Sequence, residues 1–357
     1  MEWWLDNSFA RQIRKLFASI CIRLIPEEAS YVRFKDRVFF YLGRSFLKTP
    51  DLRMLSERFS DYRSRHGEDR IRYELHCLTD GLDEKSIATA ERMLSRYHSI
   101  SKSEILDERE WFDYPDPARM ASISKEIEGL KTRLKRPGFM SELNEDIFYY
   151  ESGLLFIPEK IVSERLDGRD IIDCGAYNGD SALSFSIHHN PRRIYCFEPV
   201  QANHMKLLET IKTCNLRGAI PIKKGVGDRQ ERKKIVGRDS GSRISDGPHG
   251  ETIDITDIDS FIRKNGAVPG LIKMDIEGYE SRAIEGAIGS IKRYRPILLI
   301  AIYHTPEDFF GIKCKIEKEV GGYRFMIRHL VRHHPVCETA LIGYPDEESE
   351  FSASSRI

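Results

Sequence analysis

The chain has 357 residues, of which 40% are hydrophobic and 31% are charged, and it contains 56 basic and 56 acidic residues. This composition excludes a disordered or fibrous chain and is sufficient for a sizeable core, more readily as two domains than as one. A protein that tracks nucleic-acid phosphates normally carries a basic excess. The balanced charge therefore predicts no nucleic-acid partner.

Membrane-spanning and secreted classes are disfavoured by what the sequence lacks. The longest apolar runs, such as 297–303, are far shorter than the roughly 20 residues that span a bilayer. The N-terminus has no secretory signal pattern, and the seven cysteines are scattered without a Cys-x-x-Cys pair. Such cysteines are typical of reduced thiols rather than of disulfides or a zinc site. We therefore expect a cytoplasmic protein.

The first 150 residues have apolar residues at helical spacing, for example Leu52, Leu55 and Phe59. Asp83 is predicted to cap a further helix. Prolines and charges between residues 107 and 138 indicate a linker with one short helix. We predict a mainly helical N-terminal domain, residues 1–150, of unassigned role, and a second domain at residues 151–357.

Residues 1–25 combine Trp3 and Trp4 with an apolar stripe and several basic side chains. A helix of this kind can lie on an anionic membrane surface. More commonly it docks on its own protein or on a dimer partner. Both interpretations remain open.

The second domain alternates strands and helices. Strands are predicted at 170–174, 193–197, 219–223, 271–276, 296–303, 323–330 and 337–344, and helices at 181–188, 201–214, 279–294 and 306–320. This alternation predicts a mostly parallel α/β sheet with helices on both faces. About six residues join the last two strands, too few for a crossover helix, so these strands are predicted to form an antiparallel hairpin.

The first strand leads into a turn that contains Gly175 and Gly179. Gly175 allows the backbone to turn sharply and to leave room for a ligand, and ligands of such sheets bind at the carboxyl ends of the strands. Glu198 ends the second strand, about 20 residues later, where an acid can accept the hydroxyls of a ribose. Tyr177 occupies the place of the second glycine of a dinucleotide fingerprint, which favours S-adenosylmethionine over NAD. Ordinary turn glycines and a solvated Glu198 are the alternative.

Five segments, residues 173–181, 197–199, 225–228, 272–280 and 303–308, occur in the order seen in FkbM-type methyltransferases. Residues 150–345 thus resemble this family of class I S-adenosylmethionine-dependent enzymes, and the Lys-x-Asp-x-Glu-Gly element at 273–278 is the most specific part. Many members are linked to O-methylation of sugars or polyketides. The resemblance implies a Rossmann-like sheet with an antiparallel C-terminal hairpin, and S-adenosylmethionine as cofactor.

The resemblance also implies a cofactor site. Glu198 would hold the ribose hydroxyls, and Asp228 would accept a hydrogen bond from the adenine amino group. Carboxylates suit a sulfonium cation, whereas they would repel a pyrophosphate. The implied cofactor-binding residues are Asp173, Gly175, Ala176, Tyr177, Gly179, Asp180, Glu198, Pro199, Gly227 and Asp228.

The predicted catalytic residues are Asp275, Glu277 and His304, at the ends of the fourth and fifth strands. Asp275 and Glu277 share one strand face with Lys273, and charged groups there are costly to bury unless they are paired or used. We predict Asp275 or His304 as general base and Glu277 as an acceptor-binding residue. The alternatives are a structural ion pair and a histidine that bonds a nearby carbonyl. These groups could hold Mg²⁺ with waters, but the spacing does not demand it, so no metal site is assigned.

The remaining motifs carry weaker expectations. The pairs 188–189 and 333–334 are expected to be solvated histidines, and residues 237–250 are expected to form a flexible loop that covers the acceptor or merely connects two elements. Together these features predict an S-adenosylmethionine-dependent methyltransferase for a hydroxyl of a sugar, glycan or related small metabolite. A lipid or peptide acceptor, or a non-catalytic scaffold for a helical interaction module, are the alternatives.

Overall fold

The computed structural model describes residues 50–102, 116–134, 144–237, 242–245, 247, 249–331 and 334–346. The predictions for residues 1–25 lie outside these ranges. Among the described helices, none combines the length and the apolar character that crossing a bilayer requires.

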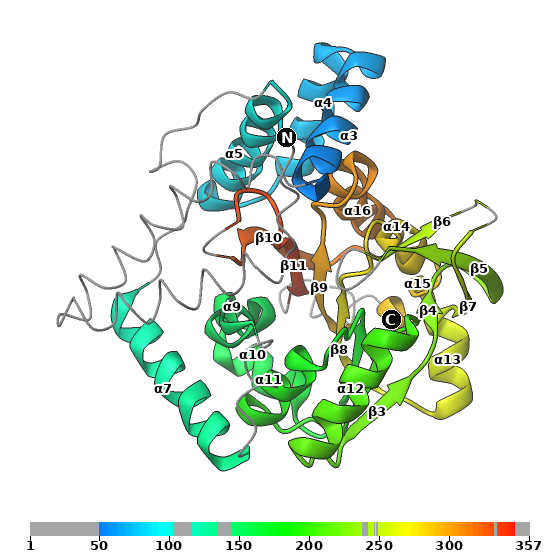
Figure 1. Ribbon diagram of the computed structural model, residues 1–357. Coiled ribbons are helices and arrows are strands. Elements are labelled where there is room, and N and C mark those ends of the chain that lie inside the picture. Colours follow the sequence, from blue (N-terminus) through cyan, green and yellow to red (C-terminus); the bar gives the residue numbers. More distant parts are fainter. Residues whose placement is uncertain are drawn as a thin grey trace, which may run out of the picture.

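Helices dominate the described residues between 50 and 166 (Figure 1). They are α3 (Pro50–His66), α4 (Glu68–Thr79), α5 (Glu84–Ser101), α7 (Pro117–Leu134), α9 (Glu145–Tyr150), the 3-10 helix η2 (Glu151–Phe156) and α10 (Glu159–Leu166). Asp83 caps α5, because its Oδ1 accepts from the backbone N–H of Ser86 at 2.9 Å. The helix between residues 107 and 138 is longer than expected, since α7 has 18 residues.

The second part of the chain forms a seven-stranded sheet in the order β10-β11-β9-β8-β1-β2-β3. Its strands are β1 (Asp170–Cys174), β2 (Arg193–Phe197), β3 (Ala219–Ile222), β8 (Pro269–Met274), β9 (Ile297–Ala301), β10 (Tyr323–His329) and β11 (Thr339–Pro345). The first five are paired in parallel, and β11 is antiparallel to both β9 and β10. The predicted mostly parallel sheet with an antiparallel C-terminal hairpin is therefore confirmed.

Helices α11 (Asp180–His188), α12 (Gln201–Thr213) and α16 (Pro306–Glu319) lie close to their predicted bounds. The single helix expected at 279–294 is instead two, α14 (Glu280–Glu285) and α15 (Ile288–Tyr294). The division has a tertiary cause, because Asp259 accepts from the backbone N–H groups of Gly289 and Ser290 at 2.9 and 2.7 Å and so caps a new helix start.

A second, four-stranded sheet in the order β4-β7-β5-β6 was not predicted. Its strands are β4 (Gly225–Val226), β5 (Glu231–Val236), β6 (Arg243–Ser245) and β7 (Glu251–Thr256), and helix α13 (Ile258–Asn265) follows them. Strand β6 lies inside the segment expected to be a loop.

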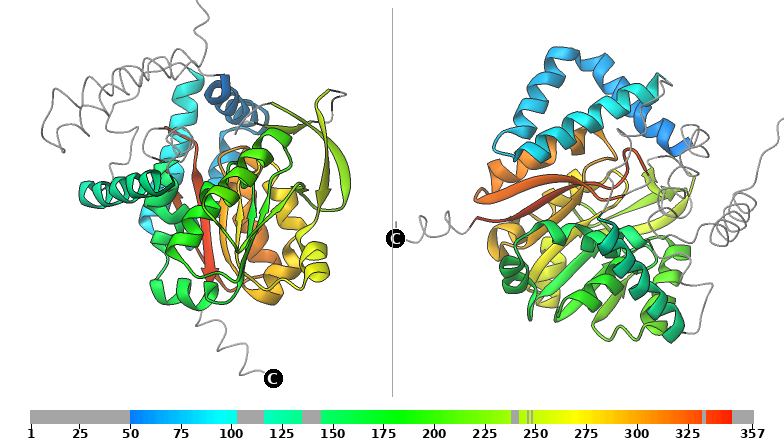
Figure 2. Two further views of the ribbon diagram at one scale, coloured as in Figure 1. Left: turned by 60° about the horizontal axis from the view of Figure 1, so that its bottom comes forward. Right: turned by 90° about the vertical axis from the view of Figure 1, so that its left-hand side faces the viewer.

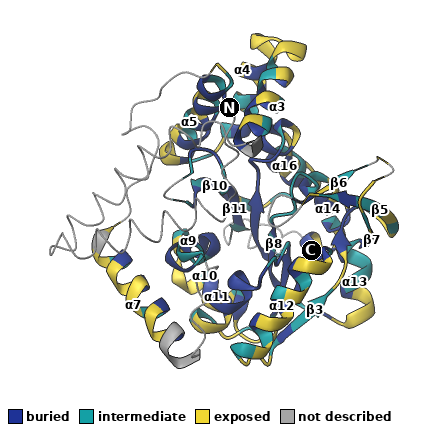
Figure 3. Ribbon diagram, viewed as in Figure 1, coloured by how far each residue is buried: buried dark blue, intermediate teal, exposed yellow. Residues whose placement is uncertain are grey.

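The two faces of the large sheet belong to two different apolar cores. Alternate residues of β1 separate them, because Ile172 belongs to the core that includes Leu55 and Tyr97 of the N-terminal helices, whereas Ile171 belongs to the core that includes Phe148. Figure 2 shows α3–α5 on one side of the β10–β11 hairpin and the green helices on the other, and Figure 3 shows the buried strands between them. Helices α3–α5 thus share a core with the sheet, and the domain boundary at residue 150 stays a prediction.

Candidate active site

A cavity of about 580 Å³ lies at the carboxyl ends of the central parallel strands. Its walls come from the loops after β1, β2, β8 and β9, from helix α3, from β6 and from the loop between β10 and β11. Its size falls within the roughly 300–1,000 Å³ typical of sites for small molecules. The strand ends therefore meet at a site, as expected for an open α/β sheet.

The glycine turn after β1 is required for a different reason from the one predicted. Gly175 has a φ of 81°, and a Cβ atom there would overlap the backbone carbonyl oxygen of Asp275. The glycine is thus required because the loops after β1 and β8 cross closely, and the space beside its Cα is filled by protein rather than by a ligand. Gly179 has a φ of 85° and caps α11, where a Cβ would crowd Leu207 and Thr210.

Glu198 lies buried at the end of β2 and lines the cavity. Its Oε2 accepts from the backbone N–H of Tyr177 at 3.1 Å, and its Oε1 accepts from that of Val200 at 2.9 Å. Burial raises the pKa of this carboxyl to about 7. Because each carboxylate oxygen can accept more than one hydrogen bond, Glu198 retains capacity for the hydroxyls of a ribose.

The cavity brings together some of the predicted cofactor residues but not all of them. Those that line it are Gly175, Tyr177, Asp180, Glu198 and Pro199, whereas Asp173, Ala176, Gly179, Gly227 and Asp228 do not. Burial raises the pKa of Asp180 to about 6. The assignments as a set stay a prediction.

Two of the predicted cofactor-binding residues bind other side chains of the protein and do not line the cavity. Asp173 is buried, lies 3.2 Å from Lys273 Nζ and accepts from the Ser181 hydroxyl at 2.6 Å. Asp228 pairs with Arg229 and Arg282 at 3.2 and 3.4 Å. Around β4 the cavity wall is instead formed by residues 224–226.

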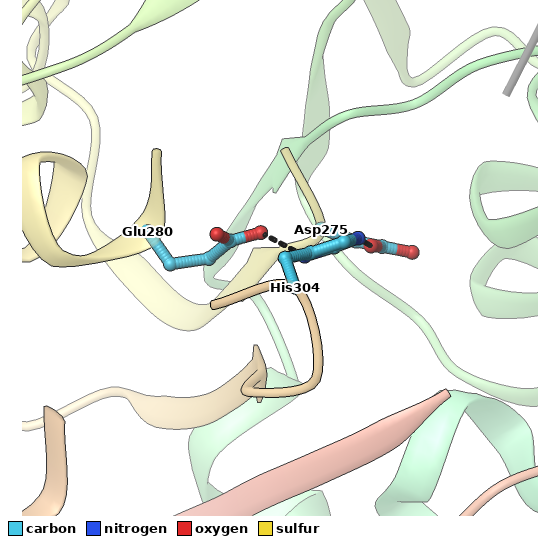
Figure 4. A group of neighbouring side chains, drawn as sticks. All are labelled: Asp275, Glu280 and His304. Carbon is cyan, nitrogen blue, oxygen red and sulfur yellow. Dashed lines mark ion pairs between the residues drawn. The ribbon is translucent and has the colours of Figure 1, made fainter. Parts of the chain in front are cut away.

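The predicted catalytic residues Asp275 and Glu277 both lie near the imidazole of His304. Figure 4 shows this imidazole between Asp275 and Glu280. His304 Nε2 lies 3.6 Å from Asp275 Oδ1 and 3.5 Å from Glu277 Oε2, and its Nδ1 lies 2.9 Å from Glu280 Oε1. The contacts are ionic, since neither ring nitrogen makes a hydrogen bond of good geometry. Only 1% of His304 is exposed, so these charges interact with little screening by water.

Glu280 organises this cluster. It is fully buried, and its two oxygens accept from the backbone N–H groups of Ile276 and Gly278 at 2.7 and 2.9 Å. Burial opposes the charge on His304, but Glu280, followed by Glu277 and Asp275, outweighs it and raises the pKa of His304 to about 10. The imidazole therefore carries a proton at neutral pH, which argues against its predicted role as general base.

Glu338 also lines the cavity, although it is not among the predicted site residues. It precedes β11 and has a left-handed backbone, with a φ of 58°. Burial, and next the charge of Asp275, raise its pKa to about 8. Tyr177 and Glu277 line the same cavity with φ values of 45° and 60°. Such backbone strain in non-glycine residues gathers at functional sites.

The described histidines of the two pairs also differ from expectation, and His333 lies outside the described residues. His334 lines the cavity instead of being solvated, accepts from the backbone N–H of Cys337 at 2.9 Å, and has a pKa that burial lowers to about 3. His188 and His189 are partly buried and lie 3.5 and 3.4 Å from Glu126 and Glu151.

Donor atoms of Asp275, Glu280 and His304 lie within 4.8 Å of one another, which is close enough for a metal ion. Glu280 already accepts two backbone N–H groups and pairs with His304, and a metal would have to displace the proton of the imidazole. The cluster is complete as an ion-paired network, and its chemistry does not call for Mg²⁺.

Residues 173–334 match the family model described as the methyltransferase FkbM domain. This segment is an FkbM-type methyltransferase domain. It contains the predicted cofactor-binding and catalytic residues, whereas α3 and the loop residue Glu338 lie outside it. No curated protein matches the chain.

The fold is similar to the crystal structure of methyltransferase FkbM from Methylobacillus flagellatus KT, with a TM-score of 0.54, 21% identity, and coverage of 77% of this chain and 59% of that one. The chain thus spans 59% of the length of that protein. Fibrillarin from Aeropyrum pernix with bound S-adenosyl-L-methionine is similar at a TM-score of 0.31 and 18% identity, covering 50% and 67% of the two chains. An rRNA methylase from Streptococcus thermophilus is similar at a TM-score of 0.35 and 13% identity, covering 53% of this chain and 93% of that one.

Proposed function

We propose that the protein is an S-adenosylmethionine-dependent O-methyltransferase that acts on a hydroxyl group of a sugar, glycan or related small metabolite. The observation that carries the proposal is a cavity lined by two chemically different groups of side chains. The Glu198 carboxyl follows β2, whereas Asp275, Glu277 and Glu338 come from the loops after β8 and before β11. The first suits a ribose, and the second suits the removal of a proton.

The residues present fit the cofactor. Glu198 would hold the ribose hydroxyls, and Phe197 and Val226 supply apolar wall area for an adenine. Carboxyl groups along the cavity, including Asp180 and Asp275, favour a positively charged ligand. When bound, S-adenosylmethionine would supply an activated methyl group on its sulfonium.

The chain's own task is to align the acceptor and to remove the proton of its hydroxyl. We assign Asp275 as the base and Glu277 as an acceptor-binding residue. The positive charge of His304 lies 3.6 and 3.5 Å from these carboxylates and holds the three side chains together. Glu338 lines the same cavity, and burial, followed by the charge of Asp275, raises its pKa to about 8.

Transfer from methyl-¹³C S-adenosylmethionine to a panel of sugars and glycans tests the proposal, with the product position read by NMR. We expect an O-methyl signal and stoichiometric S-adenosylhomocysteine. Asp275→Asn should lower kcat by about 100-fold or more, the usual contribution of a general base, and should bind S-adenosylhomocysteine like the wild type. Glu164→Gln, on the exposed side of α10, is the matched control. A methyl group on nitrogen or carbon, or full turnover by Asp275→Asn, would contradict the assignment.

A further inference from the structure

Two guanidinium groups approach one another at the cavity from parts of the chain far apart in sequence. Arg58 belongs to α3 and Arg243 to β6, and both line the cavity. Arg58 Nη2 lies 3.9 Å from the sulfur of Met54, and Arg243 Nη1 lies 2.9 Å from the same sulfur. A thioether is a weak acceptor, so this shared contact places two positive charges side by side without satisfying them.

Within the described residues, neither arginine of this pair is in direct contact with a carboxylate, and the other contact of Arg58 is from its Nη1 to the His304 carbonyl oxygen at 2.8 Å. Burial, followed by the charge of Arg243, lowers the pKa of Arg58, while Glu277 acts in the opposite direction. Two like charges held together are unfavourable. A bound anion would remove that cost.

Arg58 of this pair lies beside the reacting groups. Arg58 contacts the backbone of His304, whose ring lies 3.6 Å from the proposed base Asp275. Glu198, which would hold the ribose, is at the end of a different strand, two places away in the sheet from the one that leads to Asp275. An anion bound by the two arginines would therefore belong to the acceptor.

We propose that the acceptor carries an anionic group, a phosphate or a carboxylate, close to the hydroxyl that is methylated, and that Arg58 and Arg243 bind it. The proposal rests on the proposed function and narrows its substrate class. Guanidinium groups recognise the oxygens of both anions through paired, charge-assisted hydrogen bonds. It also gives the N-terminal helices a role, because Arg58 lies outside the matched methyltransferase segment.

Anion binding to the full chain saturated with S-adenosylhomocysteine tests the proposal. Inorganic phosphate and acetate are titrated separately at low salt, with the wild type, Arg58→Gln and Arg243→Gln. The control is Arg232→Gln, an exposed arginine that pairs with Asp254 on the small sheet. We expect one anion site in the wild type and the control, weakened about tenfold by either cavity substitution, as for loss of a charge-assisted hydrogen bond. The anion that binds more tightly, phosphate or acetate, identifies the acceptor's anionic group as a phosphate or a carboxylate.

Equal anion affinity in all four proteins would overturn the proposal. So would a loss of S-adenosylhomocysteine affinity in Arg58→Gln or Arg243→Gln, because the arginines would then serve the cofactor's own carboxylate. Retained S-adenosylhomocysteine binding also shows that each variant is folded. Failure of the wild type to bind S-adenosylhomocysteine would instead count against the proposed function.

Discussion

Substitution of Glu280 by Gln removes the charge that holds His304 in its protonated form while it preserves the shape of the side chain. Glu280 is fully buried, 2.9 Å from His304 Nδ1, and accepts two backbone N–H groups from the loop after β8. We expect Glu280→Gln to fold less stably and to change how stability depends on pH.

The structure gives the magnitude and the sign of this effect. Raising the pKa of His304 from its ordinary 6.5 to about 10 corresponds to roughly 5 kcal/mol, since one pKa unit is about 1.4 kcal/mol. Asp275 and Glu277 remain in the variant, so we expect it to lose about 3 kcal/mol near pH 6.5, at the lower end for a broken buried pair. Because the pKa of His304 is higher in the folded protein, the folded state gains the full stabilisation below pH 6.5. This stabilisation is lost as the pH rises through about 10.

Urea unfolding of the wild type and Glu280→Gln at pH 6.5, 8 and 9.5 measures this difference, and Glu164→Gln serves as the exposed control. The free-energy gap between wild type and Glu280→Gln should narrow steadily with rising pH. A double-mutant cycle with His304→Gln should give a coupling energy that narrows in the same way. A gap of constant size across this range would refute a charged Glu280–His304 pair.

Two further predictions concern residues of the predicted cofactor site. Gly175→Ala should destabilise the protein by about 3 kcal/mol, because the added Cβ overlaps the Asp275 carbonyl oxygen and the backbone is left-handed. The control Gly168→Ala also has a positive φ but has nothing within 4 Å, so it should lose only about 1 kcal/mol of stability, from the backbone alone. Similar losses of stability for both variants in urea unfolding would contradict the packing argument. Affinity for S-adenosylhomocysteine should decrease as the pH falls through about 7, since protonation of Glu198 removes an acceptor; calorimetry at pH 8 and 5.5 checks this, and a decrease that persists in Glu198→Gln would assign it to another group.

The sheet was predictable because each strand carries its own signal. Residues 170–174 and 193–197 are short apolar runs followed by turn residues, and both strands form with these bounds. The antiparallel hairpin followed from connection length alone. The division of residues 279–294 into two helices was not predictable, because it depends on Asp259, a residue of another helix that caps the second start.

Site residues that belong to a recognisable motif could be predicted from the sequence. Site residues that only the tertiary fold brings to the cavity could not. Asp275, Glu277 and His304 come from neighbouring strand ends, so their proximity was expected. The charge of His304 was not, since it depends on how deeply Glu280 is buried. Glu338 interrupts the apolar run 336–342 as a lone acid, which is a usable signal. Arg58 gives no signal, because only packing of α3 on the sheet brings it to the cavity.

Calorimetric titration of the full chain with S-adenosylhomocysteine tests the central claim, that the cavity at the carboxyl ends of the strands is a cofactor site for methyl transfer. We predict saturable one-to-one binding by the wild type and by the control Glu164→Ala. Glu198→Ala should weaken it by about tenfold or more, because hydrogen bonds from the ribose to a charged acceptor are lost. Absence of binding by the folded wild type, or undiminished binding by Glu198→Ala, would contradict the account.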